Sequence, residues 1–516
     1  MGDRPSGTAA LRVVFSRSHA EGVLWGMSVA QLVLAVAALF MVVAAVGGRP
    51  GWGWWLLAAA ALVALILIPV RGRSLADVGP ALVVEAVMRM LGWHIFRGGP
   101  VRRDPAGGFD GGVGGFDVGQ PMLPGALSRL RFGSYRVGRA GPPVCVITDT
   151  ADGTVTVVLA VTGSGGALTD TAAANAQADA FGSMLDALAR GNAPVVSLQV
   201  LHRVIPDQGD EVWREARRRG GVGGRFARQA YQALLDAHAD GGLRHESYVI
   251  LRIDPSRDTG SVREFGGGAA AAAALAVQWV STVRRQLQAC GVQVTGWLPP
   301  RGVAAVIRSA YDPASDRMVK RRGGGGGDTD GGDQGLPSGV DPSAAGPMYA
   351  RRAMTYYAHN DHVTRVWWIQ QWPRAAAGAP VGFLQPLLLG LPHRHTVSLL
   401  FRPVPYRKAA RQATTASSSV ETRQHLNAKI GRRRKKTDDR ELADINRREN
   451  ETVDGYATFS VGGFVSVTAP GREHLESVRA DTESAINECN LEAQRWILET
   501  DQAFAMAALP LARGLA

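Results

Sequence analysis

The sequence VTRVWWIQQWPR spans residues 363–374 and is the densest aromatic run outside the apolar N-terminal region. Successive side chains of a β-strand point to opposite faces, so Trp368 and Trp372 would share one face and Trp367 and Ile369 the other. Tryptophan on both faces predicts a strand that is buried between two layers. The alternative is a partner interface formed by Trp367, Trp368 and Trp372, because tryptophan is enriched in binding hot spots.

Strand and helix patterns alternate on both sides of this strand. Strands are predicted at residues 144–148, 154–161, 195–204, 248–253, 292–297, 354–357, 363–371, 396–404, 457–467 and 503–507. Helices are predicted at residues 173–190, 211–239, 269–289, 302–311, 383–389 and 474–499. Asp152-Gly153, between the first two strands, is a hairpin turn signal. The fold class that this order predicts is α+β, with mixed sheets in ferredoxin-like layers.

A polar stretch at residues 407–451 predicts one long polar helix or a helical hairpin. Its apolar positions are too sparse to bury a full face against a core. Gly431 precedes a basic cluster made of Arg432, Arg433, Arg434, Lys435 and Lys436. This cluster is a candidate contact for anionic lipid or nucleic acid, and the alternative is a solvated basic tip.

Two uncharged apolar stretches lie near the N-terminus, at about residues 23–46 and 52–70. A hydrocarbon core ~30 Å thick needs about 20 apolar residues, so the pair predicts a two-helix transmembrane hairpin. Basic residues flank its outer ends, which places both termini and the α+β region in the cytoplasm. Residues 75–96 predict an amphipathic helix along the inner face of the membrane. The predicted localisation is therefore the cell (inner or plasma) membrane, with a multi-pass topology.

Two glycine-rich stretches divide the remainder of the chain, and neither has enough apolar residues to form a core. The sequence therefore predicts five segments. They are the membrane hairpin with its amphipathic helix at 1–97, a linker at 98–125, an α+β cytoplasmic domain at 126–322, a disordered loop at 323–347 and an α+β continuation at 348–516.

The chain carries no recognisable catalytic apparatus. It has no Gly-Lys dipeptide, and therefore no phosphate-binding P-loop for ATP. Its three cysteines are far apart, which argues against a disulfide framework and a zinc site. We expect no catalytic residue, metal or cofactor. His359, Asp361 and His362 nevertheless concentrate potential ligands, so a membrane-tethered enzyme of unknown reaction stays an open alternative.

Several motifs resemble a known family when they are taken in order. They are PVRGR at 69–73, the tryptophan strand at 366–374, GFLQPLLL at 382–389, RPVP at 402–405 and LPLARGL at 509–515. The chain thus resembles actinobacterial conjugation proteins that join a PrgI-like membrane hairpin to a region like the N-terminal domain of the VirB-type conjugation ATPase. Some similar proteins are identified as type VII secretion EccE-like, which is the competing resemblance.

The resemblance implies a non-catalytic inner-membrane scaffold of a type IV secretion or conjugative DNA-transfer machine. A full conjugation ATPase would carry its motor after this region, which implies that the ATPase is a separate chain. The expected partners are that ATPase, other membrane components and the lipid bilayer, in an oligomeric assembly. Direct contact with nucleic acid stays open. The alternative function is that of a type VII secretion EccE-like membrane component.

Overall fold

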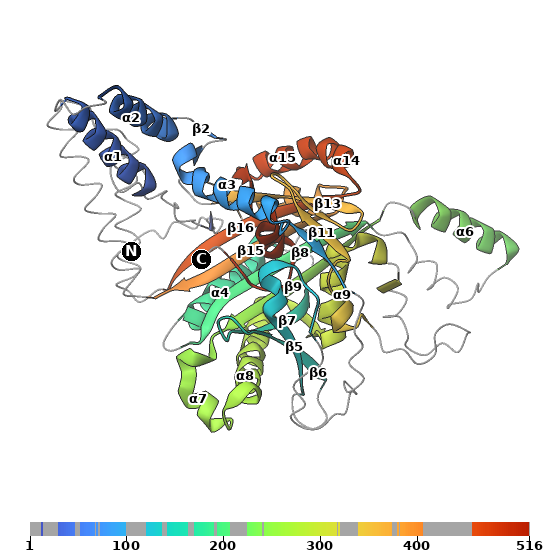
Figure 1. Cartoon of the computed structure of the whole chain (residues 1–516). Coiled ribbons are helices and arrows are strands. Elements are labelled where there is room, and N and C mark those ends of the chain that lie inside the picture. Colours follow the sequence, from blue (N-terminus) through green and yellow to red (C-terminus); the bar gives the residue numbers. More distant parts are fainter. Residues whose placement is uncertain are drawn as a thin grey trace, which may run out of the picture.

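The computed structural model places one large β-sheet at the centre of the chain, with helices on both of its faces (Figure 1). The residues that it describes are 12–13, 29–46, 52–67, 69–70, 73–99, 120–136, 142–163, 170–189, 193–206, 224–239, 242–316, 318–319, 339–373, 379–380, 382–405 and 457–514.

The central sheet has thirteen strands in the order β4-β11-β12-β13-β16-β15-β8-β9-β7-β6-β5, with β10 beside β7 and β17 beside β13. Every pairing among these described strands is antiparallel. The strands are β4 (Ile95–Arg97), β5 (Leu130–Arg136), β6 (Pro143–Asp149), β7 (Val155–Thr162), β8 (Val195–Pro206), β9 (Leu243–Ile253), β10 (Gln293–Trp297), β11 (Tyr349–Arg352), β12 (Tyr357–His359), β13 (His362–Gln371), β15 (His395–Val404), β16 (Thr458–Ala469) and β17 (Glu492–Arg495). Separate short pairs are β1 (Arg12–Val13) with β14 (Ala379–Pro380) and β2 (Pro69–Val70) with β3 (Arg73–Ser74).

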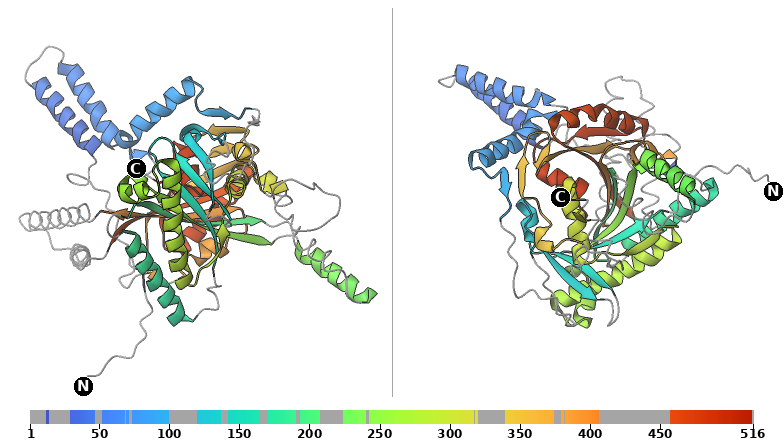
Figure 2. Two further views of the ribbon diagram at one scale, coloured as in Figure 1. Left: turned by 90° about the horizontal axis from the view of Figure 1, so that it is seen from below. Right: turned by 90° about the vertical axis from the view of Figure 1, so that its right-hand side faces the viewer.

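Helices cover both faces of the curved sheet. The helices are α1 (Val29–Val46), α2 (Trp52–Leu67), α3 (Leu75–Met90), α4 (Thr171–Ala189), α6 (Arg225–Ala239), α7 (Thr259–Glu264), α8 (Gly268–Ala289), α9 (Pro300–Tyr311), α11 (Gln385–Leu389), α14 (Arg472–Ser477), α15 (Arg479–Glu488) and α16 (Thr500–Ala508). The sheet curves around α9 and α16, whereas α4 and α8 pack on the opposite face (Figure 2).

The apolar runs of the central strands follow from this two-sided burial. In β6, Val144 and Val146 belong to the core beneath α4 and α8, and Cys145 and Ile147 belong to the core around α9 and α16. A strand that is covered on both faces needs apolar residues at consecutive positions rather than at every second one.

The tryptophan strand is buried on both faces, as its sequence predicts. Trp367 and Ile369 of β13 pack in one core cluster, and Trp368 packs against the opposite one. Trp372 packs with Trp367, so its predicted face is wrong. The pairing of β13 with β17 shifts register between Ile369 and Gln371, and such a shift breaks the alternation of side chains.

The predicted fold class is wrong in the arrangement of its sheets. Strands from residues 126–322 and 348–516 join in one antiparallel sheet, because β8 pairs with β15 from Leu198 to Val204. Strand β8 has 12 residues and β15 has 10, about twice the mean strand length. Two small ferredoxin-like layers would leave these long edges unpaired, which is unfavourable.

The predicted transmembrane hairpin is also wrong. Within the described residues, no single helix is both long and apolar enough to cross a membrane. The apolar helical stretches Leu34–Val46 and Gly53–Ala64 reach about 20 Å at 1.5 Å per residue, short of a ~30 Å hydrocarbon core. Among the helices that the structure describes, only Pro255–Glu264 with Gly268–Ala289 has the length and composition, as a pair bent by 102°. The predicted spans at 23–46 and 52–70, and the multi-pass position in the cell membrane, are corrected accordingly.

Two C-terminal elements differ from their predictions. Residues 503–507 lie inside helix α16 rather than a strand. The single helix predicted at 474–499 is divided into α14, α15 and strand β17. Asn490 has φ +53°, a left-handed conformation that ends a helix, and β17 begins two residues later. The long polar helix predicted at 407–451 lies outside the described residues.

Candidate functional site

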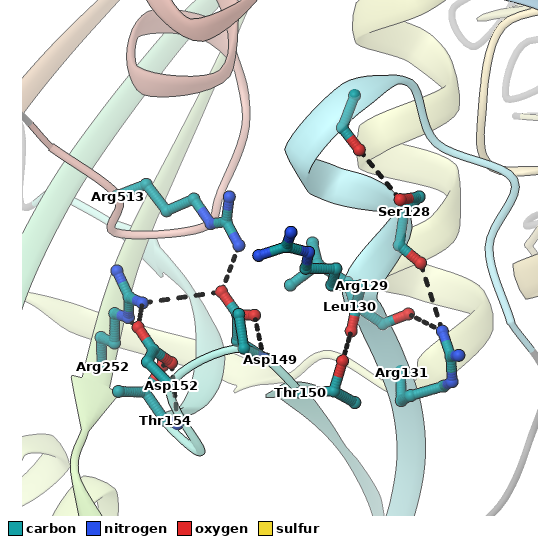
Figure 3. A network of polar contacts seen from close by, with 12 residues as sticks. Ser128, Arg129, Leu130, Arg131, Asp149, Thr150, Asp152, Thr154, Arg252 and Arg513 are labelled. Carbon is teal, nitrogen blue, oxygen red and sulfur yellow. Dashed lines mark hydrogen bonds and ion pairs between the residues drawn. The ribbon is translucent and has the colours of Figure 1, made fainter.

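Four charged side chains meet where β6 turns into β7 (Figure 3). Asp149 ends β6 and Asp152 lies in the turn, while Arg252 comes from β9 and Arg513 from the tail after α16. Arg513 Nη2 pairs with Asp149 Oδ2. Arg252 Nη2 lies 3.7 Å from Asp149 Oδ2 and 2.5 Å from Asp152 Oδ2. These four residues are named the Asp149 cluster below.

The hairpin turn aims its carboxylates at the arginines. Gly153 has φ +71°, which glycine adopts at little cost. Asp152 Oδ1 accepts hydrogen bonds from the Thr154 amide at 3.0 Å and from the Thr154 hydroxyl at 2.7 Å. The Thr154 hydroxyl accepts from Arg252 Nε at 2.9 Å, and Arg252 lies opposite Thr156 in the strand register. The hairpin predicted from Asp152-Gly153 is confirmed.

At this turn, burial and the neighbouring charges shift the pKa values of Asp152 and Arg252 in opposite directions. Burial raises the pKa of Asp152, but hydrogen bonds from Thr154 and the charges of Arg252 and Arg513 outweigh it and hold that pKa below its usual range. Burial lowers the pKa of the Arg252 guanidinium, and the charge of Asp152 opposes this shift. Asp152 is therefore a stable acceptor for guanidinium groups at neutral pH.

Among the described residues, more guanidinium groups than carboxylates lie at this end of the strands. Burial and the neighbouring charge of Arg252 lower the pKa of Arg402, which is half-buried on β15. Arg131 donates to backbone carbonyls rather than to a carboxylate. Exposed Arg129 lies beside Arg513 in Figure 3. Arg252 and Arg513 contact the two aspartates, and Arg129, Arg131 and Arg402 lie near this cluster. These five arginines are named the arginine edge, a surface suited to an anionic group or an acidic protein surface.

A buried polar network positions the tail that carries Arg513. Gln199 of β8 is fully buried, and its Nε2 donates to the Leu509 carbonyl at 3.2 Å. Its Oε1 accepts from the Ala512 amide at 2.7 Å. Ser197 Oγ, also on β8, donates to the Ala512 carbonyl at 2.7 Å. Because each contact is to the tail backbone, the network fixes the path of the tail across β8.

The tryptophans of the predicted partner interface lie in or beside the core. Trp367 is 1% exposed and Trp372 is 9% exposed. Trp368 is half-buried, and its ring meets that of Trp496 edge-on with 6.3 Å between centroids. A partner interface at these residues stays a prediction, and Trp368 is the most accessible of the three.

The predicted ligand turn is engaged in internal hydrogen bonds. His359 is fully buried, with Nδ1 2.7 Å from the Tyr311 carbonyl and Nε2 2.7 Å from Thr364 Oγ1. Burial lowers the pKa of His359 to about 3, so the neutral ring donates from Nδ1 and accepts at Nε2. His362 and Asp361 beside it are part of no metal-ligand group, because the described residues contain no cluster of three or more His, Cys, Asp or Glu suited to a metal ion.

The predicted basic cluster at residues 432–436 lies outside the described residues, so its contact with lipid or nucleic acid stays a prediction. The Asp149 cluster was missed by the sequence analysis. Its turn was predicted from Asp152-Gly153, but no local signal joins that turn to Arg252 and Arg513.

One family model matches part of the chain. Residues 243–327 match the family described as "Putative type VII ESX secretion system translocon, EccE". No curated protein matches the chain. At the family level the match supports a secretion-system component. It favours the EccE-like alternative over the type IV prediction, and it gives no support to a PrgI-like hairpin or a VirB-like region.

The EccE-matching segment is built into the centre of the fold. It contains β9, which pairs with both β7 and β8, and α8, which covers that part of the sheet. Glu246 of β9 lies 3.5 Å from Arg203 of β8, and Arg394 donates to Asp316 at 2.6 Å. Both arginines also donate to Ser309 Oγ, at 2.6 and 2.8 Å. Buried charges from outside the segment therefore fix it to the rest of the chain.

Proposed function

We propose that this chain is a non-catalytic structural component of a type VII secretion machine. The observation that carries the proposal is the EccE match over residues 243–327. The position of that segment supports it, because β9 and α8 belong to the central sheet and its cover rather than to an appended module. A segment in this position shapes the whole fold.

The arginine edge is the surface by which we propose that the chain docks an acidic neighbour. Arg252 belongs to the EccE-matching segment, whereas Asp149 and Arg513 do not. The cluster thus joins the matching segment to the C-terminal tail, and exposed Arg129 lies beside it. Complementary charge gives speed and specificity to association more than raw affinity, which suits contacts within an assembly.

The partners that follow from this proposal are other secretion-system components. A separate ATPase chain is the finer part of the proposal, and it is consistent with the lack of a P-loop in this sequence. The type IV alternative is not carried further, because nothing in the comparison favours it.

The test is co-purification of the full chain from its native host, together with a secretion assay. We expect type VII components to co-purify, and we expect deletion of the chain to abolish export of type VII substrates. Recovery of type IV conjugation components instead, or normal export after deletion, would overturn the proposal.

A charge-reversal pair tests the docking surface. Arg129→Glu lies on the arginine edge, and Arg225→Glu lies on α6, away from that edge (Figure 1). Both residues are exposed, so neither change should unfold the chain. We expect Arg129→Glu alone to reduce co-purification, and its difference from wild type should be largest at low ionic strength and shrink as salt screens the charges. Equal effects of the two variants would exclude the arginine edge as the docking surface.

A further inference from the structure

A second arginine–carboxylate cluster lies at the start of α16 and lines a pocket of about 230 Å³. Arg352 of β11 sits between two carboxylates. Its Nη2 is 3.1 Å from Glu85 Oε2 of α3, and its Nε is 3.2 Å from Asp501 Oδ1. The Asp501 pocket, as it is named here, has a polar wall of Arg352, Asp501, Tyr357 and His94.

Polar atoms of this wall have no hydrogen-bond partner among the described residues. They are the Tyr357 hydroxyl and His94 Nδ1, and also Asp501 Oδ1 and Arg352 Nε, which contact each other only as an ion pair at 3.2 Å. Tyr357 is only 2% exposed. Buried polar groups in folded proteins are almost always hydrogen-bonded, so a hydroxyl that is unpaired in this way indicates a bound molecule.

The charge of Arg352 is already balanced by the two carboxylates, and Arg89 Nε adds a contact to Glu85 Oε1 at 3.2 Å. An anion would therefore meet carboxylates without a free counter-charge. Besides the ion-paired carboxylate of Asp501, the wall offers a hydroxyl and an imidazole nitrogen that can accept hydrogen bonds. Burial raises the pKa of Asp501, and the charge of Arg352 offsets this only in part. A cation beside Asp501 would relieve the cost of its burial.

The rest of the pocket wall fits a small organic cation. Trp93, Phe96 and Met88 line it. Aromatic faces attract cations, and a primary ammonium group is one of the cations that they bind. The volume of about 230 Å³ is below the about 300–1,000 Å³ of drug-sized ligand sites. It suits one side chain or one small amine rather than a nucleotide.

We propose that the Asp501 pocket binds a primary ammonium group, with Asp501 as the counter-charge and the Tyr357 hydroxyl as a second acceptor. The group can come from a lysine side chain of a partner protein or from a free small amine. The proposal does not rest on the secretion function, because no residue of the pocket lies in the EccE-matching segment.

The experiment is ligand-observed NMR on the full chain, with three probes of similar shape. n-Butylammonium is the cation, n-butanol the neutral control and butyrate the anion. We expect the ammonium probe to bind about tenfold more tightly than the alcohol, the gain expected for a charge-assisted hydrogen bond, and butyrate to give no signal. Equal binding of ammonium and alcohol would overturn the proposal and indicate a pocket that holds water.

Variants separate the pocket from other carboxylates. Asp501→Asn should weaken ammonium binding about tenfold, and Tyr357→Phe several-fold. Asp179→Asn, an exposed aspartate on α4, should leave it unchanged. Tyr357→Phe removes only an unpaired hydroxyl and keeps the packing. It therefore tests ammonium binding even where Asp501→Asn does not fold. Ammonium binding that is unchanged in Tyr357→Phe would contradict the proposal.

A competition experiment with a peptide identifies the source of the amine. Acetyl-Gly-Lys-Gly-amide should compete with n-butylammonium if the natural ligand is a lysine of a partner protein, and its lysine-acetylated form should not compete. Competition by small amines without competition by the peptide indicates a free amine as the ligand. Displacement of n-butylammonium by the acetylated peptide would overturn the role of the charge.

Discussion

The two arginine–carboxylate clusters at either end of the segment from α16 to the tail use the same residue types to opposite effect. In the Asp149 cluster, Asp152 accepts hydrogen bonds from Thr154 and Arg252, and its pKa is held low. In the Asp501 pocket, Asp501 Oδ1 contacts Arg352 Nε only as an ion pair at 3.2 Å, and burial raises the pKa of Asp501. The difference lies in burial and hydrogen bonding: the Asp152 side chain is 49% exposed and is bonded by Thr154, whereas the Asp501 side chain is 22% exposed.

This contrast assigns different roles to the clusters. A saturated buried ion pair fixes structure, because removing one partner leaves the other uncompensated. A buried ion pair whose neighbouring polar groups lack hydrogen bonds lowers stability until a ligand bonds to those groups. Substitutions in the Asp149 cluster and its tail network should therefore mainly change stability, and substitutions in the Asp501 pocket should mainly change binding.

The largest effect is expected at Gln199, which holds the tail. Gln199→Leu keeps the approximate size but leaves the Ala512 amide unpaired in the core and removes the hydrogen bonds from Gln199 Nε2 to the Leu509 carbonyl and the Ser398 hydroxyl. We expect a loss of about 3 kcal/mol in the free energy of unfolding, since a buried unpaired amide costs about 1–3 kcal/mol and each further hydrogen bond that is lost costs about 0.5–1.5 kcal/mol. Urea unfolding measures this. Gln288→Leu on the exposed side of α8 is the control, and a similar loss in both variants would mean that the tail is not held at Gln199.

The second effect is expected at Asp149. Asp149→Asn preserves shape but leaves the Arg513 guanidinium, which is 19% exposed, without its counter-charge, and removes one of the two carboxylates beside Arg252, which is 14% exposed. We expect a loss of about 2 kcal/mol, less than the 3–5 kcal/mol of fully buried pairs because water reaches these arginines. The midpoint of urea unfolding reports it. Asp179→Asn should cost less than about 0.5 kcal/mol. Equality of the two variants would show that Asp149 is not a structural partner.

Local sequence patterns predicted much of the sheet but not its assembly. The strands around β6, β8, β9 and β13 were predicted because their apolar runs are visible in the sequence. Which strands pair is a long-range property, and the pairing of β8 with β15 has no local signal. The segment AFAMA at 503–507 was predicted as a strand, since periodicity does not distinguish a short buried helix from a buried strand.

The two clusters show the same limit at the level of sites. Asp152-Gly153 predicts a turn from two adjacent residues, and the structure confirms it. Arg513 reaches Asp149 from 364 positions away, and no spacing rule connects them. The Asp501 pocket gathers α3, β11, β12 and α16, so its residues share no motif.

The third expected effect concerns pH: the contributions of Asp501 and Asp152 to the free energy of unfolding should change with pH in opposite directions. The raised pKa of Asp501 means that the folded state holds this proton more tightly than the unfolded chain does. Its contribution to stability therefore grows as the pH falls from neutrality through that raised pKa towards 3.8. The lowered pKa of Asp152 means that its contribution is complete above 3.8 and is lost as the pH falls below that value.

Comparing the stability of wild type with that of two variants separates the pH dependence of Asp501 from that of Asp152. Wild type should gain stability relative to Asp501→Asn between pH 7 and pH 4, and should lose stability relative to Asp152→Asn below pH 4. Thermal unfolding across this pH range measures both differences. A constant offset between wild type and Asp501→Asn would mean that Asp501 has an ordinary pKa, and the contrast between the clusters would then disappear.

The smallest effect on the free energy of unfolding is expected at two buried tyrosines. They test directly whether a hydroxyl in each part of the core has a hydrogen-bond partner. The Tyr248 hydroxyl donates to Glu246 Oε2 at 3.0 Å, whereas the Tyr357 hydroxyl has no partner among the described residues. Tyr248→Phe should therefore cost about 1.5 kcal/mol, because it removes a hydrogen bond to a charged acceptor. Tyr357→Phe should change stability by less than about 0.5 kcal/mol, in the stabilising direction, because it removes an unpaired polar atom from the core. Since the two substitutions delete the same atom from the same residue type, size and packing cancel in the urea midpoints. A loss of more than about 1 kcal/mol in Tyr357→Phe would mean that its hydroxyl is bonded in the ligand-free chain, and the Asp501 pocket would then be as saturated as the Asp149 cluster.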